Sequence, residues 1–121
     1  MYKYYNARPD GKEKNDCVCR AIAVATGLKY KAVLNLLEIS AYLNNCDKYC
    51  ICCYHNLLEN LLGYQCIKCK DFEKVKDIAK LYKFDKVLIR IEGHLTASIY
   101  GSVLDIWDCT NKYVDCYWVI K

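Results

Sequence analysis

The segment Asn15–Gly27 constrains the fold of this chain more than any other part of the sequence. It opens with two side chains that can cap a helix, Asn15 and Asp16, and continues with small and branched apolar residues. Arg20 is the single charge in that run, and the closing glycine suits the left-handed position that ends a helix. The pattern predicts a helix over Cys17–Thr26 that is buried on most sides.

Cys17 lies in the first turn of this expected helix, where the helix dipole and the unpaired N–H groups favour a thiolate. A nucleophilic cysteine would be placed there. The alternative is a small buried cysteine that packs beside alanines. Cys19 is the second candidate nucleophile, but it points about 200° away around the helix. We therefore expect Cys19 to pack in the core.

Composition limits the kind of protein that this chain can be. It has 121 residues, 55% of them hydrophobic, with one proline and five glycines, which suits one domain over residues 1–121. No stretch of about 18 apolar residues predicts a membrane span, and the N-terminus lacks the apolar core of a secretory signal. We expect a cytoplasmic location with the ten cysteines reduced, no membrane partner, and no nucleic-acid partner, because the net charge of +4 is not clustered.

The remaining sequence predicts helices first and strands later, and hence an α+β fold with N-terminal helices packed on a mainly antiparallel sheet of about four strands. Hydrophobic periodicity predicts helices at Lys29–Leu43, around Leu57–Leu62 and at Phe72–Tyr82, the last with Asp71 as its N-cap. Strand-like segments lie at Tyr2–Asn6, Tyr64–Cys69, Lys86–Ile91, His94–Tyr100, Val103–Trp107 and Tyr113–Ile120.

The chain has only two histidines, and one of them begins an expected strand. If the next turn is centred near Gly101, cross-strand pairing places Asp108 beside His94 on the same face. A shift of the register by one residue would bring Trp107 opposite His94 instead. Asp105 has the other side-chain parity in the first register, so it is the weaker partner.

A carboxylate bonded to one imidazole nitrogen leaves the other nitrogen to take a thiol proton. Cys17, His94 and Asp108 would thus form a nucleophile, a base and an orienting group in that chain order. The alternative is a histidine at a strand end that bonds to a nearby carboxylate for structural reasons only.

Three short segments, Asn15–Ala21, Gly93–Ala97 and Asp105–Asp108, resemble parts of papain-like cysteine peptidases. More narrowly, they resemble small peptidase-like proteins encoded by bacteriophages and mobile elements. The resemblance spans roughly residues 15–120 and rests on few residues. It implies a papain-like fold with Cys17 as nucleophile, His94 as base and Asp108 as orienting group.

One departure from that family concerns the oxyanion site. Papain-like enzymes usually carry a glutamine a few residues before the cysteine, whereas the only glutamine here is Gln65. Asn15 is the residue that could supply a side-chain amide instead, together with the backbone N–H of Cys17.

The other cysteines raise the question of a metal. Cys66 and Cys69 have zinc-knuckle spacing, and Cys46, Cys50, Cys52, Cys53 and His55 lie upstream. A three-residue step along a strand, however, places Cys66 and Cys69 on opposite faces. We therefore expect no metal and no cofactor.

The function that these observations favour is a thiol hydrolase or acyl-transferase acting on a peptide, isopeptide or related acyl bond. Its partner would be a peptide or protein substrate. An alternative is a catalytically weak or inactive protein of the same fold that binds and blocks a host protein. A zinc-binding interaction module is a third interpretation.

Overall fold

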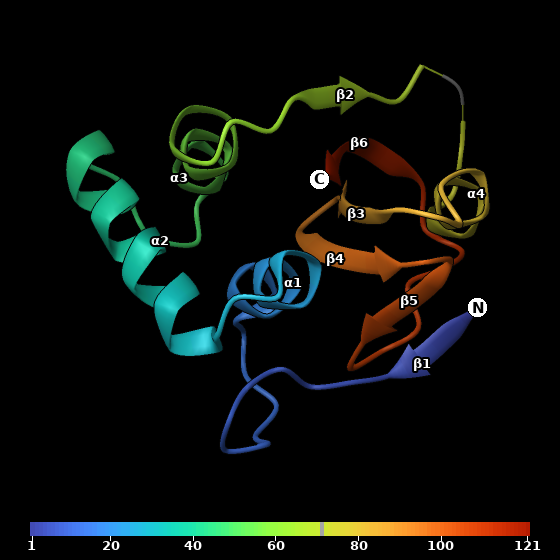
Figure 1. Cartoon of the computed structure of the whole chain (residues 1–121), viewed down its shortest axis with the longest axis horizontal. Helices are drawn as coiled ribbons and strands as arrows, with labels where there is room; N and C mark the ends of the chain where they lie inside the picture. Colours follow the sequence, from blue (N-terminus) through green and yellow to red (C-terminus); the bar gives the residue numbers. More distant parts are fainter. Residues whose placement is uncertain (71) are drawn as a thin grey trace.

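A computed structural model describes residues 1–70 and 72–121 and shows helices on both sides of one sheet (Figure 1). The helical elements are α1 (Cys17–Thr26), α2 (Tyr30–Asn44), α3 (Ile51–Asn56), the π-helical turn η1 (Leu57–Leu61) and α4 (Val75–Leu81). The strands are β1 (Tyr2–Tyr4), β2 (Cys66–Lys68), β3 (Lys86–Ile91), β4 (His94–Ile99), β5 (Ser102–Asp105) and β6 (Val114–Ile120). None of the described helices is long and apolar enough to cross a membrane.

The strands form one open sheet in the order β1-β5-β4-β3-β6-β2. Every neighbouring pair is antiparallel except β1 and β5, which are parallel. The α+β class is therefore confirmed, but the expected number of about four strands is wrong. Two strands of three residues each, β1 and β2, extend a central set of four at its two edges.

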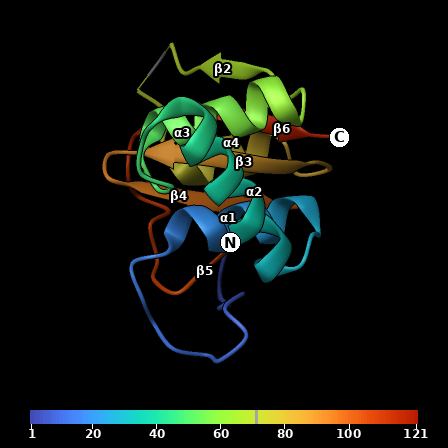
Figure 2. The ribbon, with the colours of Figure 1, turned by 90° about the vertical axis from the view of Figure 1, so that its left-hand side faces the viewer.

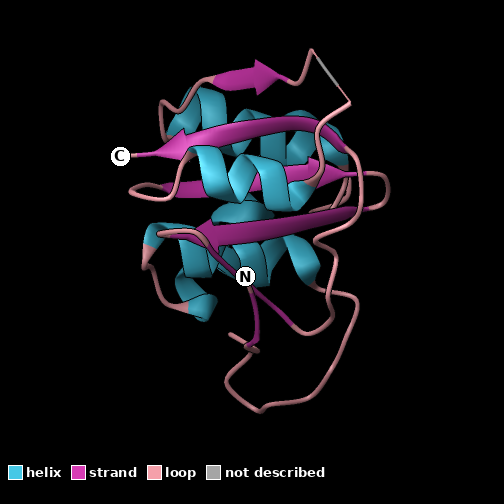
Figure 3. Cartoon of the chain, turned by 90° about the vertical axis from the view of Figure 1, so that its right-hand side faces the viewer, coloured by secondary structure: helices cyan, strands magenta, loops and turns pink. Residues whose placement is uncertain are grey.

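The two faces of the sheet carry separate apolar clusters. One face packs against α1, α2 and α3, and its cluster includes Ile22, Leu37 and Trp118. The other face packs against α4, and its cluster includes Ile78 and Ile89. Figure 2 shows the first three helices in front of the sheet, and Figure 3, from the opposite side, shows α4 across the strands.

The helix α1 has the predicted bounds, and Gly27 ends it in the left-handed conformation with φ of 75°. Most of α1 is buried, and Arg20 is itself only 5% exposed. Asp16 is the N-cap, but its side chain makes no capping hydrogen bond. The expectation that it binds the free N–H groups is wrong, because two arginines and a tyrosine occupy its carboxylate.

The other helices differ from the predictions mainly at their ends. Leu43, expected on the buried stripe of α2, is 64% exposed because the helix extends past the body of the domain. The helix predicted at Phe72–Tyr82 begins only at Val75, where Lys74 is the N-cap and pairs with Tyr113 as an isolated bridge. The predicted cap Asp71 lies outside the described residues.

The hairpin between β4 and β5 fixes which residues face each other near its open end. Its turn has two central residues, Tyr100 and Gly101, both with positive φ (50° and 86°), as a tight hairpin turn requires. Ile99 therefore pairs with Ser102, and the register continues inward from there. This register differs by one residue from the register that a turn centred on Gly101 would give.

Candidate active site

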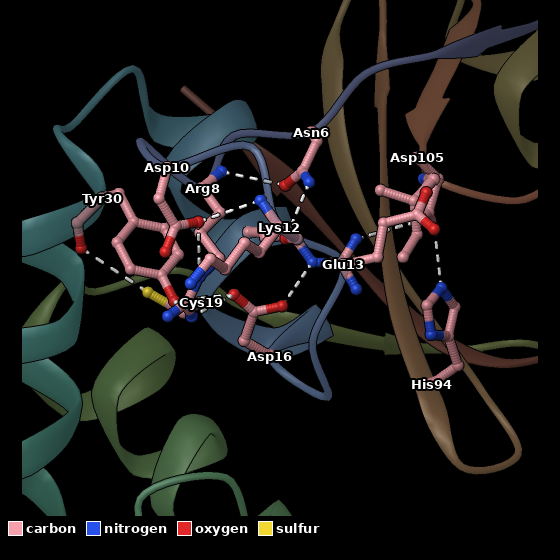
Figure 4. Close-up of polar contacts among 12 residues, drawn as sticks. Asn6, Arg8, Asp10, Lys12, Glu13, Asp16, Cys19, Tyr30, His94 and Asp105 are labelled. Carbon is pink, nitrogen blue, oxygen red and sulfur yellow. Dashed lines mark hydrogen bonds and ion pairs between the residues drawn. The ribbon is translucent and has the colours of Figure 1, made fainter.

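The register of β4 and β5 gives His94 a different carboxylate from the one predicted. Nε2 of His94 lies 2.6 Å from Oδ2 of Asp105 (Figure 4). In the shifted register Asp105 has the same parity as His94, whereas Asp108 does not. Asp108 is exposed and accepts hydrogen bonds from the backbone and side chain of Thr110. The prediction that Asp108 orients His94 is therefore wrong.

Cys17 lies beside the imidazole because α1 packs directly on β4. Cys17 and His94 line the same cavity. Burial opposes ionisation of Cys17, but the neighbouring imidazole, the backbone N–H of Leu95 and the positive charges of His94 and Arg20 lower its pKa below the ordinary thiol value. The surroundings therefore favour a thiolate at Cys17.

The pKa of the His94 imidazole is shifted in the opposite direction from that of Cys17. Burial opposes a charge on His94, yet the hydrogen bond with Asp105, the neighbouring thiols of Cys109 and Cys17 and the charge of Asp105 raise its pKa to about 11. Burial also opposes ionisation of Asp105, but the bond from His94 outweighs it and lowers the pKa of that carboxyl. The surroundings thus favour an imidazolium at His94 above the buried Asp105 carboxylate.

Two further side chains enclose the imidazole. The Trp107 ring packs against His94 with 4.9 Å between ring centroids and an angle of 57° between the planes. Cys109 is fully buried, and its Sγ lies 3.9 Å from Oδ2 of Asp105. Trp107 and Cys109 both lie in the segment after β5, where the chain turns back across the site.

A series of hydrogen-bonded charged side chains, mostly buried, contacts Asp105. Arg20 on α1 donates to Oδ1 of Asp105 at 3.2 Å and, through Nε, to Oδ1 of Asp16 at 2.7 Å. Asp16 also accepts hydrogen bonds from Tyr30 at 2.7 Å and Arg8 at 3.2 Å (Figure 4). The single charge inside the apolar helix therefore ties α1 to the carboxylate that orients His94.

Asn15, the expected oxyanion donor, is exposed, and it does not line the cavity beside Cys17. The backbone N–H of Cys17 is better placed for that task. It belongs to the first turn of α1, whose N–H groups have no partner within the helix. No acceptor for it occurs among residues 1–70 and 72–121.

The cavity beside the thiol has a volume of about 280 Å³ and is open on one side. Tyr49, Ile51 and Tyr54 form one wall on and before α3, and the hairpin between β3 and β4 forms the other wall. Arg90 lies at its rim, where its guanidinium is 3.7 Å from Asp115. The cavity can accept a short extended segment or a side chain next to Cys17.

The remaining sequence candidates are placed as follows. Cys19 is fully buried, as predicted, and its thiol donates to the Tyr30 carbonyl at 3.5 Å. Cys66 packs with the cluster under α1–α3, and Cys69 packs with the cluster under α4, so the two do face opposite sides of the sheet. His55 interacts with Glu59 and Arg90, away from His94.

Three groups of possible metal ligands occur among the described residues, each with its donor atoms within 4.8 Å. One contains His94, Asp105 and Cys109 and overlaps the candidate active site. The second contains His55, Glu59 and Cys66, and the third is formed by Cys46 and Cys50, which lie between α2 and α3, and Cys52 in the first turn of α3.

Sequence reasoning ranked Asp105 behind Asp108 as the partner of His94, and it missed Arg20 and Cys109 as parts of this site. Arg20 had a visible signal, since a single charge in a buried apolar helix needs a partner. The contact of Asp105 with His94 depends on the register of the hairpin, and the position of Cys109 depends on the loop after β5. Neither role could be assigned without the turn geometry.

The fold and the site together define an α+β domain in which Cys17 and His94 line one cavity and His94 is hydrogen-bonded to Asp105. Comparisons with protein-family models, with curated protein sequences and with solved structures found no match to this chain.

Proposed function

We propose that this protein is a thiol hydrolase or acyl-transferase of papain-like architecture that acts on a peptide, isopeptide or related acyl bond. Cys17 is the nucleophile, His94 the proton donor and acceptor, and Asp105 the orienting carboxylate. The observation that carries the proposal is the 2.6 Å bond between His94 and Asp105 beneath a thiol whose pKa is lowered. The chain order of these roles is that of papain-like enzymes.

The reaction begins with the Cys17 thiolate. Its sulfur adds to the carbonyl carbon of the substrate, and the carbonyl electron pair moves onto oxygen. When the adduct collapses, the leaving group departs with a proton from His94 and a thioester remains on Cys17. Asp105 holds Nε2 of His94, so Nδ1 is the nitrogen that remains for this transfer.

Hydrolysis of the thioester completes the cycle. His94 takes a proton from water as the water oxygen adds to the thioester carbonyl. Collapse of the second adduct breaks the C–S bond, releases the carboxylic acid product and regenerates the Cys17 thiolate beside protonated His94. An acceptor amine or alcohol in place of water would make the same sequence an acyl transfer.

In this proposal the negative oxygen of each adduct is bound by the backbone N–H of Cys17. Helix α1 points its first-turn N–H groups and the positive end of its dipole toward the same place. The substrate is a peptide or protein segment that lies along the cavity between α3 and the β3–β4 hairpin. A cytoplasmic location in a phage-infected host, with reduced thiols, belongs to the same proposal.

A second candidate is favoured by one observation. Asn15 does not line the cavity, so no side-chain amide replaces the glutamine of papain-like enzymes there. With a single oxyanion donor the protein would acylate but turn over poorly, and it would act by binding and blocking a host protein.

The two candidates are separated by acylation with an activated ester. The protein is mixed with p-nitrophenyl acetate, nitrophenol release is followed, and the acetylated residue is mapped by mass spectrometry. A hydrolase gives one fast acetylation at Cys17 followed by continued turnover, and both are lost in Cys17→Ala. Acetylation without turnover supports the binding protein. Equal, slow acetylation of several cysteines would refute the assignment of Cys17 as the reactive thiol, in the hydrolase and in the binding protein alike.

The matched control is Asp108→Asn, since Asp108 is exposed and bonds only within its own loop in the described part of the chain. This variant is expected to acylate at the wild-type rate, whereas Asp105→Asn is expected to be slow. Cleavage of a peptide or amide substrate should also fall as the pH rises through the His94 pKa of about 11, because the amine leaving group then finds no proton on the imidazole.

A further inference from the structure

The segment between α2 and α3, together with the first turn of α3, gathers three thiol groups outside the candidate active site. The Sγ atoms of Cys46, Cys50 and Cys52 all lie within 4.8 Å of one another, and those of Cys50 and Cys52 are 2.8 Å apart. Cys46 and Cys50 are half-buried, and Cys52 is exposed. The group contains sulfur donors alone and is reachable from solvent.

The backbone holds this arrangement by hydrogen bonds. Asn45 ends α2 in the left-handed conformation, with φ of 51°, and turns the chain back. The Asp47 side chain then accepts the N–H of Tyr49 at 3.0 Å, and the Asp47 carbonyl accepts the N–H of Cys50 at 3.0 Å. This turn brings Cys50 next to Cys46 without any need for a bound ion.

We propose that Cys46, Cys50 and Cys52 bind a thiophilic d¹⁰ cation, Zn²⁺ or Cu(I). Thiolate donors without carboxylates select such ions. Zn–S bonds of about 2.3 Å in tetrahedral geometry place neighbouring sulfurs about 3.8 Å apart. The three sulfurs all lie within 4.8 Å of one another, and the 2.8 Å edge between Cys50 and Cys52 needs to open by about 1 Å, which rotation of the exposed Cys52 side chain provides.

Among residues 1–70 and 72–121, three ligands and not four come together here. Cys53 follows directly, but it is fully buried and its thiol donates to the Leu37 carbonyl at 3.3 Å, on the far side of the helix turn. A bound Zn²⁺ would therefore keep one position for a water or another small ligand. Cu(I) would be bound in a three-coordinate plane. Binding of either ion displaces the thiol protons.

The site would brace one wall of the cavity beside Cys17. Tyr49 lies between the first two ligands, Ile51 lies between the last two, and both line that cavity. An ion that joins residues 46, 50 and 52 would fix the start of α3 and hence the position of this wall. It takes no part in the chemistry proposed for Cys17.

The test uses the full-length protein, reduced, freed of metal and kept under argon. It is titrated with Zn²⁺ in competition with a chromophoric chelator, and separately with Cu(I) delivered from a chelate complex. The proposal predicts one ion per chain. Cys46→Ser and Cys52→Ser should each weaken binding at least about tenfold, because even loss of an outer-shell partner costs that much.

Two controls exclude the other donor groups. Cys17→Ser tests binding at the candidate nucleophile, and Cys66→Ser tests the group with His55 and Glu59. Both should bind the ion as the wild type does. Zn²⁺ should also protect Cys50 and Cys52 of the wild-type protein from alkylation, a readout that needs no variant to fold.

Several results would overturn the proposal. They are absence of binding to the reduced protein, binding that persists in both cluster variants, loss of binding in Cys17→Ser, or unchanged alkylation of Cys50 and Cys52. Formation of a Cys50–Cys52 disulfide that survives the reducing step would also overturn it, because those sulfurs would then be unavailable as thiolates.

Discussion

Cys17 and Cys19 lie two positions apart on the same helix, yet their thiols have opposite properties. Cys17 faces β4, where His94 and the N–H of Leu95 lower its pKa despite burial. Cys19 faces the other way, where burial and the negative charge of Asp16 raise its pKa to about 12. Both thiols lie near the start of the same helix, so the helix end cannot explain the difference between their pKa values. The comparison teaches that the groups contacting each thiol decide its ionisation.

Replacement of His94 by alanine should remove the difference between the two thiols and have the largest effect. The variant loses both the positive charge that stabilises the Cys17 thiolate and the group that transfers protons. Acylation and turnover with p-nitrophenyl acetate should fall at least about a hundredfold, as measured by nitrophenol release. A decrease below threefold would show that His94 does not act on Cys17.

The buried charge chain below the site should dominate stability. Arg20→Met leaves Asp105 without its arginine and removes one of the partners of Asp16. Loss of one partner from a buried ion pair costs about 3 kcal/mol or more, measured by urea unfolding. A matched variant at a half-buried position, Arg8→Met, should cost less because Arg8 is partly solvated. Equal losses in the two variants would contradict the role given to Arg20.

The same charge chain has a pH dependence with a defined sign. Burial of Asp16 opposes its ionisation, but the hydrogen bonds from Tyr30, Arg20 and Arg8 lower its pKa below the unfolded value. The stability that Asp16 contributes is thus present above its unfolded pKa and lost as the pH falls through its folded pKa. Asp16→Asn should flatten this part of the acid unfolding curve followed by circular dichroism.

Asp105→Asn should weaken the Cys17–His94 pair by a smaller amount than loss of the imidazole. An amide holds His94 without supplying the negative charge that raises its pKa, so acylation should fall about tenfold or more. Asp108→Asn should change the rate less than twofold, because it contacts Thr110 instead. The opposite ranking of the two variants would restore the register with Asp108 beside His94.

Cys19→Ala should have the smallest effect on reactivity. Cys19 is in the core, so the change should cost about 1 kcal/mol of stability, measured by urea unfolding. The acylation rate should stay within about twofold of wild type, because Cys19 points away from His94. Loss of acylation in a folded Cys19→Ala protein would mean that the nucleophile had been assigned to the wrong thiol.

The parts of the fold that were predictable are those set by local pattern. The bounds of α1 follow from an apolar run that Gly27 ends in the left-handed conformation, and those of β3 follow from a short, mostly apolar run. The partner of His94 was mispredicted because it depends on whether the turn has two central residues or is centred on Gly101. A shift of one residue exchanges the two faces of a strand, so a small local uncertainty changed the catalytic carboxylate.

Long-range charge pairing was beyond sequence reasoning for another reason. Arg20 and Asp105 are 85 residues apart in the chain, and nothing in either local pattern says that they meet. The presence of a lone charge in the α1 run signals that some partner exists, but only the packing of α1 on the sheet identifies it. The two edge strands lie within the predicted segments Tyr2–Asn6 and Tyr64–Cys69, but each has only three residues, and their place in the sheet depends on long-range pairing that the sequence does not show.

The central claim is that Cys17, and no other thiol on α1, is held as a thiolate beside protonated His94. Limiting iodoacetamide, applied across a range of pH with the modified residue mapped by mass spectrometry, measures this directly. The account predicts that Cys17 is alkylated selectively at mildly acidic pH and that its rate is already level through neutral pH. A Cys17 rate that rises about tenfold per pH unit toward the ordinary thiol range, alongside the other cysteines, would contradict it.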